Sequence, residues 1–590
     1  MQDKILGLCL SVLPITLSVH FAERGVGQLG SSPEAVQHNG PKRTVPVMKG
    51  LRRRFIEPED LYLFEATIEN PNTQGLVIGS TEKSASSRIL NEPIFRRCKL
   101  LRLEFPKVGN PERGTFAAGA SDGCVAERSK HLRAQGILQQ SQHNRSDMIS
   151  QEAHLRVVIV GAGLSGIAAA ISTALSGHSV QVIEQAAELA EVGAGLQITP
   201  NASRLLKHWQ LRDSLWAAAA EPTKLTVHRY SGEILAHDDA FDKGIRAKYN
   251  APFVDLHRVD LQQALFERAK ELGVSFHLGE RIARIDFETT TVHSERGGEF
   301  TGDLIVAADG LWSRCREALI GQKDEPLPTG DLAYRIVLSA DQIQDLELKA
   351  LVENPEVHFW IGPGAHAVGY SVRGGKMYNI VLLVPDNLPP GISRQAGSVD
   401  EMKQLFAGWD PILNRFLDCV TSGKIDKWKL MHHGEMEKWV SDQSNLVFIG
   451  DSCHPMLPYL AQGANSSLED GAVLGLLLGR MTDKAQLPHI LRLYERLRKS
   501  RGEAIVRETF KQRHDFHMED GEEQVRRDEI FRSQLGKEIK GAFPSRWTCP
   551  EVQPWLYGYD ALEEVEKAVL EHTHLFSRPG KSRSSSCVIL

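Results

Sequence analysis

A short β-branched segment that runs directly into three spaced glycines constrains the fold of this chain more than any other feature. Val157–Val160 has the composition of a buried parallel strand, and Gly161, Gly163 and Gly166 follow it at once. Gly161 permits a tight turn, Gly163 lets a phosphate group approach the backbone, and Gly166 allows a helix to pack closely on a strand. The residues that follow have a helical composition, so the first N–H groups of that helix would face the same phosphate.

A second β-branched segment ends in an acidic residue at the distance that a dinucleotide-binding unit requires. Val180–Ile183 is followed by Glu184, and a carboxylate about 20 residues after the glycines can accept hydrogen bonds from a ribose diol. The order strand, glycines, helix, strand and acid predicts a βαβ unit that binds a dinucleotide. These residues alone do not separate NAD from FAD.

Two further predicted strands end in aspartate. One ends at Asp309-Gly310 and continues to Ser313 and Arg316, and the other ends at Gly450-Asp451 before residues 462–465 open a long helix. Ligands of open α/β sheets bind at the carboxyl ends of the strands, so both aspartates are candidate ligand contacts.

Together, the three segments resemble the family of single-component FAD-dependent aromatic hydroxylases, most closely salicylate hydroxylase-like fungal monooxygenases, over residues 156–569. The resemblance implies an α/β fold with a Rossmann-type FAD-binding domain, an interleaved β-rich substrate domain and C-terminal helices. We expect the FAD-binding domain with its C-terminal helices in residues 151–325 and 440–575. The main part of the substrate domain is expected in residues 326–439.

The resemblance also implies which residues contact FAD. They are Gly161, Gly163, Gly166 and Glu184 at the ADP, Arg258 on the flavin side, Asp309 and Gly310 in a motif that also serves the pyridine nucleotide, Asp451 at the ribityl chain, and Gly463, Ala464 and Asn465 beside the isoalloxazine ring. For the last group there is also a physical reason, because a helix beginning near Ala464 could direct N–H groups at the negative charge of a reduced flavin. The alternative is an ordinary helix cap in which Asn465 and Ser466 satisfy the backbone.

Four residues are candidates for the substrate side. His366 and Tyr370 would share one face of a strand with Val368, and the two polar side chains could face a bound phenol or simply pack within the sheet. Arg335 could hold a carboxylate with its two-pronged guanidinium or form a surface salt bridge. His366 and His454 are the candidates for a base that draws a proton from the phenol, although His454 could instead anchor the turn at the following proline.

The implied activity is that of a monooxygenase that uses FAD, NADH or NADPH, and dioxygen to hydroxylate a phenolic or aromatic-acid substrate through a flavin hydroperoxide. Two alternatives stay open. One is a flavin monooxygenase or epoxidase that acts on a larger secondary metabolite, and the other is a non-catalytic escort or binding protein on the same fold. The substrate, the choice of nucleotide and the oligomeric state are not determined by these motifs.

The composition counts against several other classes. Lys and Arg number 69 against 75 Asp and Glu, and a net charge of −6 gives no general attraction to nucleic acid. The 8 cysteines include no C-x-x-C pair, so we expect no metal site and no disulfide scaffold. Uninterrupted apolar runs stay well short of the roughly 20 residues of a membrane span, and we expect a cytoplasmic protein.

Each end of the chain carries a targeting pattern. Residues 1–150 lack sustained periodicity and read as a leader that is disordered or an artefact of the gene start. Their mostly apolar segment 5–22, which polar residues and a proline interrupt, resembles a secretory signal. Residues 576–590 read as a flexible tail ending in CVIL, a prenylation pattern on Cys587, and membrane association would depend on that lipid. Prenylation takes place on the cytosolic side, so at most one of the two signals can operate.

Overall fold

The computed structural model describes two units of the chain, residues 1–120 and 121–590. The described residues are 16–20, 65–70, 73–77, 153–189, 194–420 and 425–576. In the first unit, β1 (Thr16–His20), β2 (Glu65–Asn70) and β3 (Thr73–Val77) form an antiparallel sheet in that order. The rest of the expected leader, with most of its signal-like run, and the CVIL motif lie outside the described residues.

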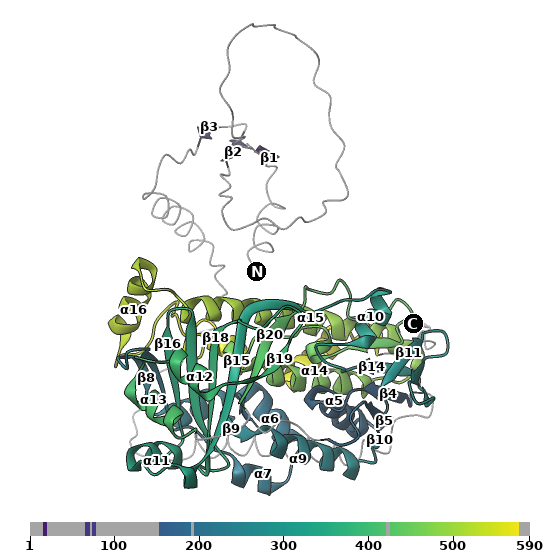
Figure 1. Ribbon diagram of the computed structural model, residues 1–590. Coiled ribbons are helices and arrows are strands. Elements are labelled where there is room, and N and C mark those ends of the chain that lie inside the picture. The colour runs from purple at the N-terminus through teal and green to yellow at the C-terminus, as the bar shows by residue number, and fades with distance from the viewer. Residues whose placement is uncertain are drawn as a thin grey trace, which may run out of the picture. The chain divides into compact units, whose positions relative to one another are not determined.

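The second unit contains a five-stranded parallel sheet, on the right of Figure 1. Its order is β10 (Ser275–Leu278), β5 (Ser179–Glu184), β4 (Arg156–Val160), β14 (Leu304–Ala307) and β21 (Leu446–Phe448). Every residue from Val157 to Val160 is buried, as in a strand that is covered on both faces. The glycine motif and both strand-end aspartates therefore follow three adjacent strands of one sheet.

Small residues let two helices approach each other closely beside this sheet. Gly471 and Gly475 of α14 (Gln462–Leu478) face α5 (Leu164–Leu175), and a Cβ on Gly471 would lie 2.5 Å from the Ala169 nitrogen. Ser172 of α5 donates a hydrogen bond to the Ala472 carbonyl at 3.1 Å. This close approach brings the start of α14 beside the glycine motif at the start of α5.

A mixed eight-stranded sheet stands on the left of Figure 1. Its order is β19 (Arg394–Gly397), β20 (Ile425–His432), β15 (Leu327–Ser339), β18 (Met377–Pro385), β17 (Ala365–Val372), β16 (Glu356–Gly362), β7 (Lys224–Arg229) and β8 (Ile234–Asp238). One face packs against α11 (Leu346–Glu353), α12 (Val399–Leu405) and α13 (Pro411–Asp418), where Tyr378 stacks on Phe416 at 4.4 Å. Two strands, β7 and β8, come from before the segment in which we expected the main part of this domain.

The remaining elements connect and cover the two sheets. Two smaller antiparallel sheets pair β11 (Ile282–Asp286) with β12 (Thr291–Ser294) and β13 (Glu299–Thr301), and β6 (Gly195–Ile198) with β9 (Val254–His257). Within the described residues, five further helices precede the eight-stranded sheet's strand β15 in the chain: α6 (Pro200–His208), α7 (Asp213–Ala218), α8 (Phe241–Tyr249), α9 (Arg258–Glu271) and α10 (Arg314–Ile320). The C-terminal helices are α15 (Leu487–Phe516), α16 (Glu522–Gln534), α17 (Gln553–Tyr557) and α18 (Ala561–Glu571).

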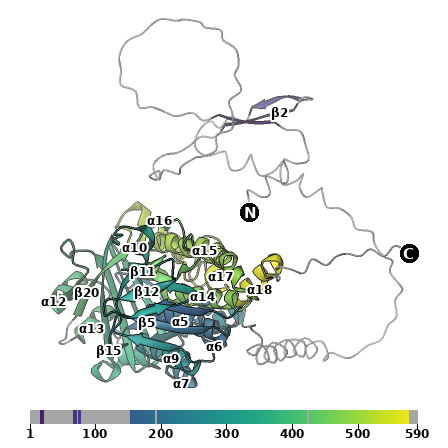
Figure 2. The ribbon, with the colours of Figure 1, turned by 90° about the vertical axis from the view of Figure 1, so that its right-hand side faces the viewer.

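The C-terminal helices contact the parallel-sheet part of the unit. Both α15 and α18 pack on α14, and Figure 2 shows them on the same side as that helix. The structure confirms the predicted α/β architecture with an interleaved β-rich sheet and C-terminal helices.

Candidate functional site

Two cavities meet at the carboxyl ends of the parallel strands. The first has a volume of about 320 Å³ and lies between the start of α14 and the eight-stranded sheet. The second, of about 450 Å³, lies beside the ends of β4, β5 and β14. Gly163, Ala308 and Gly310 line both cavities, so the two form one continuous slot.

The three glycines after β4 have different surroundings. Gly161 has a φ of +105°, and a Cβ on Gly166 would lie 1.9 Å from the Gly161 carbonyl oxygen, so both positions exclude a side chain. At Gly163 a Cβ would meet no atom within 4 Å, and no side chain caps the N-terminus of α5 there. The backbone at Gly163 is thus open to the slot, as contact with a phosphate requires.

Glu184 is held in place by backbone donors at the edge of the second cavity. Its two carboxylate oxygens accept hydrogen bonds from the Ala162 and Ala186 N–H groups, each at 2.8 Å. A carboxylate has about four acceptor positions, so these bonds fix the side chain and leave capacity for a ribose diol.

The Asp309-Gly310 turn borders the second cavity. The Asp309 carboxylate accepts hydrogen bonds from the Ser313 hydroxyl at 2.6 Å and the Cys315 N–H at 3.0 Å, which join the turn to the start of α10. Gly310 has a φ of +74°, and a Cβ on it would meet nothing within 4 Å. Asp309 therefore shapes the turn, while the backbone of Gly310 is open to the slot.

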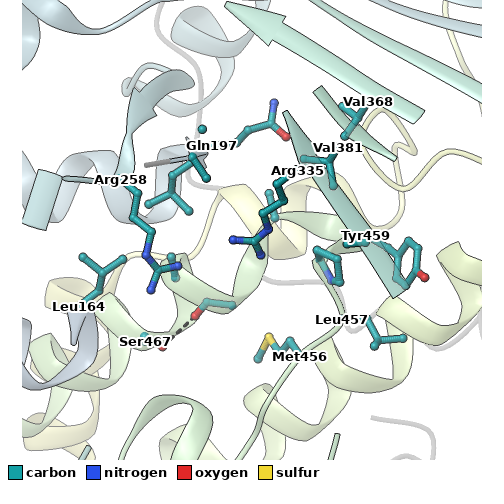
Figure 3. Close-up of a pocket in the computed structure, with 18 of the residues that line it drawn as sticks. Leu164, Gln197, Arg258, Arg335, Val368, Val381, Met456, Leu457, Tyr459 and Ser467 are labelled. Atoms are coloured by element: carbon teal, nitrogen blue, oxygen red, sulfur yellow. Dashed lines mark hydrogen bonds between the residues drawn. The ribbon is translucent and has the colours of Figure 1, made fainter. Parts of the chain in front are cut away.

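Opposite charges face the first cavity. Asp451 follows β21 in a short 3₁₀ turn and is exposed to the cavity, and Arg258 begins α9 and lines the same space. Figure 3 shows the Arg258 guanidinium directed into this space together with that of Arg335.

The N-terminus of α14 forms one wall of the first cavity. Gly463 and Ala464 line it, no side chain caps the helix, and a Cβ on Gly463 would meet nothing within 4 Å. Asn465, by contrast, is fully buried and does not line the cavity. Its amide accepts a hydrogen bond from the Thr199 N–H and donates one to the Gln197 carbonyl, both at 3.0 Å. The structure thus places Asn465 as a link between β6 and α14, where it neither caps the helix nor lines the cavity.

His454 also lies away from both cavities, in a buried ionic cluster. It donates a hydrogen bond to Asp470 at 2.5 Å and stacks on Trp439 with ring centroids 5.0 Å apart. Asp470 also accepts hydrogen bonds from the Gly450 N–H at 2.8 Å and from Arg498 at 2.7 Å. Burial alone raises the pKa of Asp470, but the charges of His454 and Arg498 outweigh it and lower the pKa below its ordinary value.

This buried ionic cluster was not predicted from the sequence. Its other members are Glu469, Asn201 and Arg501, of which Arg501 donates two hydrogen bonds to Glu469 at 2.9 Å. Asp470 lies inside the motif after residue 462, and this was a local indication of its importance. Its partner Arg498 lies on a different helix, so the local sequence did not indicate that the two would pair.

One face of the eight-stranded sheet closes the other side of the first cavity. The structure confirms that His366, Val368 and Tyr370 share one face of β17, because all three line the cavity. Arg335 of β15 lines it as well, and its guanidinium lies 5.5 Å from the ring centroid of Trp428.

The tyrosine and the histidine of this face are both uncharged at working pH. Burial raises the pKa of Tyr370 above its ordinary value, so its hydroxyl stays protonated. Burial, with a contribution from His517, lowers the pKa of His366 well below its ordinary value, so its ring is neutral at working pH. The structure therefore brings three of the four substrate-side candidates together and leaves out His454.

Further apolar lining of the cavity comes from segments that the sequence did not single out as site residues. Met456, Leu457 and Tyr459 follow the 3₁₀ turn after β21, and Trp547 comes from the C-terminal segment. The indole of Trp547 donates a hydrogen bond to the Tyr459 carbonyl at 3.1 Å and lies 5.2 Å from Phe359. These side chains give the cavity an apolar wall beside its polar groups.

In the part of the chain that the structure describes, His, Cys, Asp and Glu side chains form no group of three that could hold a metal ion. Within the same residues, none of the helices is both long and apolar enough to cross a membrane.

Comparison with known proteins gives consistent matches. A family model described as FAD binding domain matches residues 154–509. The FAD-dependent monooxygenase OpS4 of Beauveria bassiana (strain ARSEF 2860) is 49% identical over 419 residues, which cover 70% of this chain and 97% of that protein. A 3-hydroxybenzoate 6-hydroxylase of Polaromonas naphthalenivorans (strain CJ2) is 30% identical over 417 residues, 70% of this chain and 98% of that protein. A solved salicylate hydroxylase substrate complex has a TM-score of 0.58 at 22% identity, covers 71% of this chain and 99% of that one, and shows a shared fold.

Proposed function

The chain belongs to the FAD binding domain family and is a FAD-dependent monooxygenase of the aromatic hydroxylase type, and on that premise we propose that it hydroxylates a phenolic acid with a single aromatic ring. The proposal includes NADH or NADPH as reductant and dioxygen as the source of the new oxygen. The observation that carries it is the placement of Arg335 and His366 on one sheet face of the first cavity.

The slot fits FAD. Its backbone is open at Gly163, Gly310 and Gly463, three positions where a Cβ would meet no other atom within 4 Å. In this arrangement Gly163 and the start of α5 would hold the pyrophosphate, Glu184 the ribose, and Asp451 the ribityl chain. Bound FAD supplies the transfer of electrons from the pyridine nucleotide to dioxygen, while the protein supplies orientation and electrostatics.

Arg335 favours an anionic substrate. A guanidinium matches a carboxylate with two parallel hydrogen bonds, and such charge-assisted bonds are stronger than those between neutral groups. Arg335 projects from the sheet face into the cavity, where a carboxylate would also be attracted by Arg258. The name of the Polaromonas relative, a hydroxybenzoate hydroxylase, agrees with a substrate that carries both a phenol and a carboxylate.

The size of the cavity favours one ring. A volume of about 320 Å³ is at the lower end of the roughly 300–1,000 Å³ of small-molecule sites, and the flavin ring must share it. Trp547, Phe359 and Tyr459 are bulky side chains in its lining. A larger secondary metabolite therefore fits less well than a monocyclic phenolic acid.

His366 is the proposed base. Its ring lines the cavity, its Nδ1 is engaged with His517, and its Nε2 has no hydrogen-bond partner among the described residues. A neutral imidazole with an open Nε2 can accept the hydroxyl proton of the substrate, which raises electron density on the ring to be attacked, and such proton transfer contributes roughly 100- to 10,000-fold in rate.

A substrate screen tests the proposal. Purified protein with FAD is supplied with NADH or NADPH and with salicylate, 3-hydroxybenzoate or 2,4-dihydroxybenzoate, and methyl 3-hydroxybenzoate serves as the control without a carboxylate. We expect nucleotide oxidation coupled to a product heavier by one oxygen atom for at least one acid, and weaker turnover of the ester. Product formation from larger polycyclic phenols alone would contradict the proposal and favour the alternative metabolite class.

A further inference from the structure

One large side chain of the first cavity comes from a segment outside both large sheets. Trp547 lies in the connection between α16 and α17, and it lines the cavity together with Phe359 of β16 and His366 of β17. It is 2% exposed, so nearly all of its surface is covered by the protein. The space that a bound molecule can fill therefore depends on a residue that neither sheet supplies.

The indole ring of Trp547 is held by contacts on several sides. Its Nε1 donates a hydrogen bond to the Tyr459 carbonyl at 3.1 Å. Its ring centroid lies 5.2 Å from that of Phe359 and 6.2 Å from that of Phe253. A tryptophan side chain has only two χ angles, so one hydrogen bond and two ring contacts are enough to define its position.

The backbone on either side of this ring is anchored to two helices. The N–H of Arg546 donates a hydrogen bond to the side chain of Gln512 on α15 at 2.8 Å. The carbonyl of Trp547 accepts one from the side chain of Gln553 on α17 at 2.6 Å. Both glutamines are buried, and buried polar groups whose hydrogen bonds are made stiffen the structure around them.

The side chain of Arg546 adds an ionic anchor to α15. Its guanidinium pairs with Glu508 at 3.2 Å and with Asp515. Each of the three side chains is less than one fifth exposed, so solvent screens these pairs less than pairs on the surface. Trp547 is thus fixed in place before a substrate arrives, and the substrate has to fit beside it.

We propose that Trp547 sets the upper size limit of the substrate, so that the cavity accepts one aromatic ring and excludes a second ring fused to it. This inference rests on the proposed function, because a phenolic acid is the molecule on which the limit acts. A protein relaxes only in part when a large buried side chain is truncated, so Trp547→Ala leaves a space. An apolar cavity of about 150 Å³ holds a benzene molecule, and the space left by the indole should accept about one further ring.

A binding titration measures this limit without turnover. The oxidised full-length enzyme with FAD is titrated with salicylate and with 1-hydroxy-2-naphthoate, which is salicylate with a second fused ring, and binding is followed by the change in flavin absorbance. If the wild type turns over 3-hydroxybenzoate instead, 4-hydroxy-2-naphthoate is the matched two-ring acid. We expect Trp547→Ala to favour the two-ring acid over the one-ring acid at least about tenfold more than the wild type does. The ratio of kcat/KM for the two acids should shift in the same direction.

Three further measurements separate a size limit from a loss of packing. Trp409→Ala is the matched control and should keep the wild-type preference, because Trp409 packs on Phe406 at 4.7 Å on the other face of the eight-stranded sheet and lines neither cavity. Trp547→Phe should show a smaller shift toward the two-ring acid, and it tests the limit if Trp547→Ala does not fold. Added indole should occupy the space in Trp547→Ala and weaken the binding of the two-ring acid again.

The outcomes distinguish the size limit from the proposed function. A wild-type preference for one ring in both Trp547→Ala and Trp547→Phe would overturn the role of Trp547 and leave the proposed function intact. A wild type that binds the two-ring acid as tightly as the one-ring acid would overturn that role as well. A wild type that neither binds nor hydroxylates a one-ring phenolic acid would overturn the proposed function and the size limit with it.

Discussion

Asp470 accepts a hydrogen bond from the backbone N–H of Gly450 at 2.8 Å, and this bond joins α14 to the turn that presents Asp451 to the cavity. The same carboxylate is paired with Arg498 and His454, all of them buried. The two walls of the slot that meet here, the end of β21 and the start of α14, are therefore held together by one buried side chain.

Asp470→Asn should weaken both the fold and cofactor binding. Removing one partner of a buried ion pair leaves Arg498 with less compensation and costs about 3–5 kcal/mol. We expect a lower free energy of unfolding in urea and a weaker FAD affinity in a fluorescence titration. The control is Asp442→Asn, which removes an exposed partner of Lys438 and should cost less than about 1 kcal/mol. Equal effects of the two substitutions would contradict the role given to Asp470.

Gly163→Ala and Gly166→Ala should fail in different ways. A Cβ at Gly163 would meet no protein atom within 4 Å. Without FAD, Gly163→Ala should therefore unfold at the same urea concentration as the wild type without FAD, while its affinity for FAD should fall. A Cβ at Gly166 would lie 1.9 Å from the Gly161 carbonyl oxygen, so overpacking should destabilise the fold by about 1–3 kcal/mol or more. A Gly163→Ala variant that binds FAD as well as the wild type would show that no phosphate approaches this backbone.

Arg335→Gln should raise KM for a phenolic acid by about tenfold or more, because a hydrogen bond to a charged group contributes about 1.5–3 kcal/mol. Turnover of methyl 3-hydroxybenzoate should not change, since the ester has no carboxylate. Arg394→Gln is the matched control, because Arg394 stacks on the same Trp428 at 4.4 Å but does not line the cavity. An equal change in KM for acid and ester would argue against carboxylate binding.

The stability of the protein should fall in mild acid. Burial, with the neighbouring His358, lowers the pKa of His228 from 6.5 to about 4, so the unfolded chain binds a proton before the folded one does. The contribution is complete above 6.5 and is lost as the pH falls toward about 4. His228→Gln should reduce the pH dependence of the free energy of unfolding in this range by up to about 1.4 kcal/mol per pH unit, while exposed His489→Gln should not. Urea unfolding at a series of pH values measures both slopes, and identical slopes would refute the prediction.

The parallel sheet could be predicted because its signals are local. Val157–Val160 and the glycines after it lie within a short stretch whose composition and spacing determine strand, turn and helix. The same is true of the period-two pattern that placed His366 and Tyr370 on one face of β17. The identification of individual FAD and substrate contacts stays a prediction, although the slot brings most of these residues together.

The other residues of the site could not be predicted, because their positions depend on contacts between segments that are distant in the sequence. His517 and Trp547 reach the site from the C-terminal part of the chain, and nothing in their neighbouring residues distinguishes them from ordinary helix and loop residues. Asn465 and His454 stand inside recognisable motifs, yet the packing of α14 and α15 turns their side chains into the interior. Sequence spacing places a residue near a strand end but does not determine which way its side chain points.

The most direct measurement is the origin of the oxygen in the product. The purified holoenzyme, with NADH or NADPH and 3-hydroxybenzoate or salicylate, is supplied with isotopically labelled dioxygen in unlabelled water, and the product is weighed by mass spectrometry. A FAD-dependent hydroxylase of phenolic acids should introduce one labelled oxygen atom for each nucleotide oxidised. Oxygen from water in the product, or nucleotide oxidation that yields only hydrogen peroxide with every phenolic acid, would contradict that function.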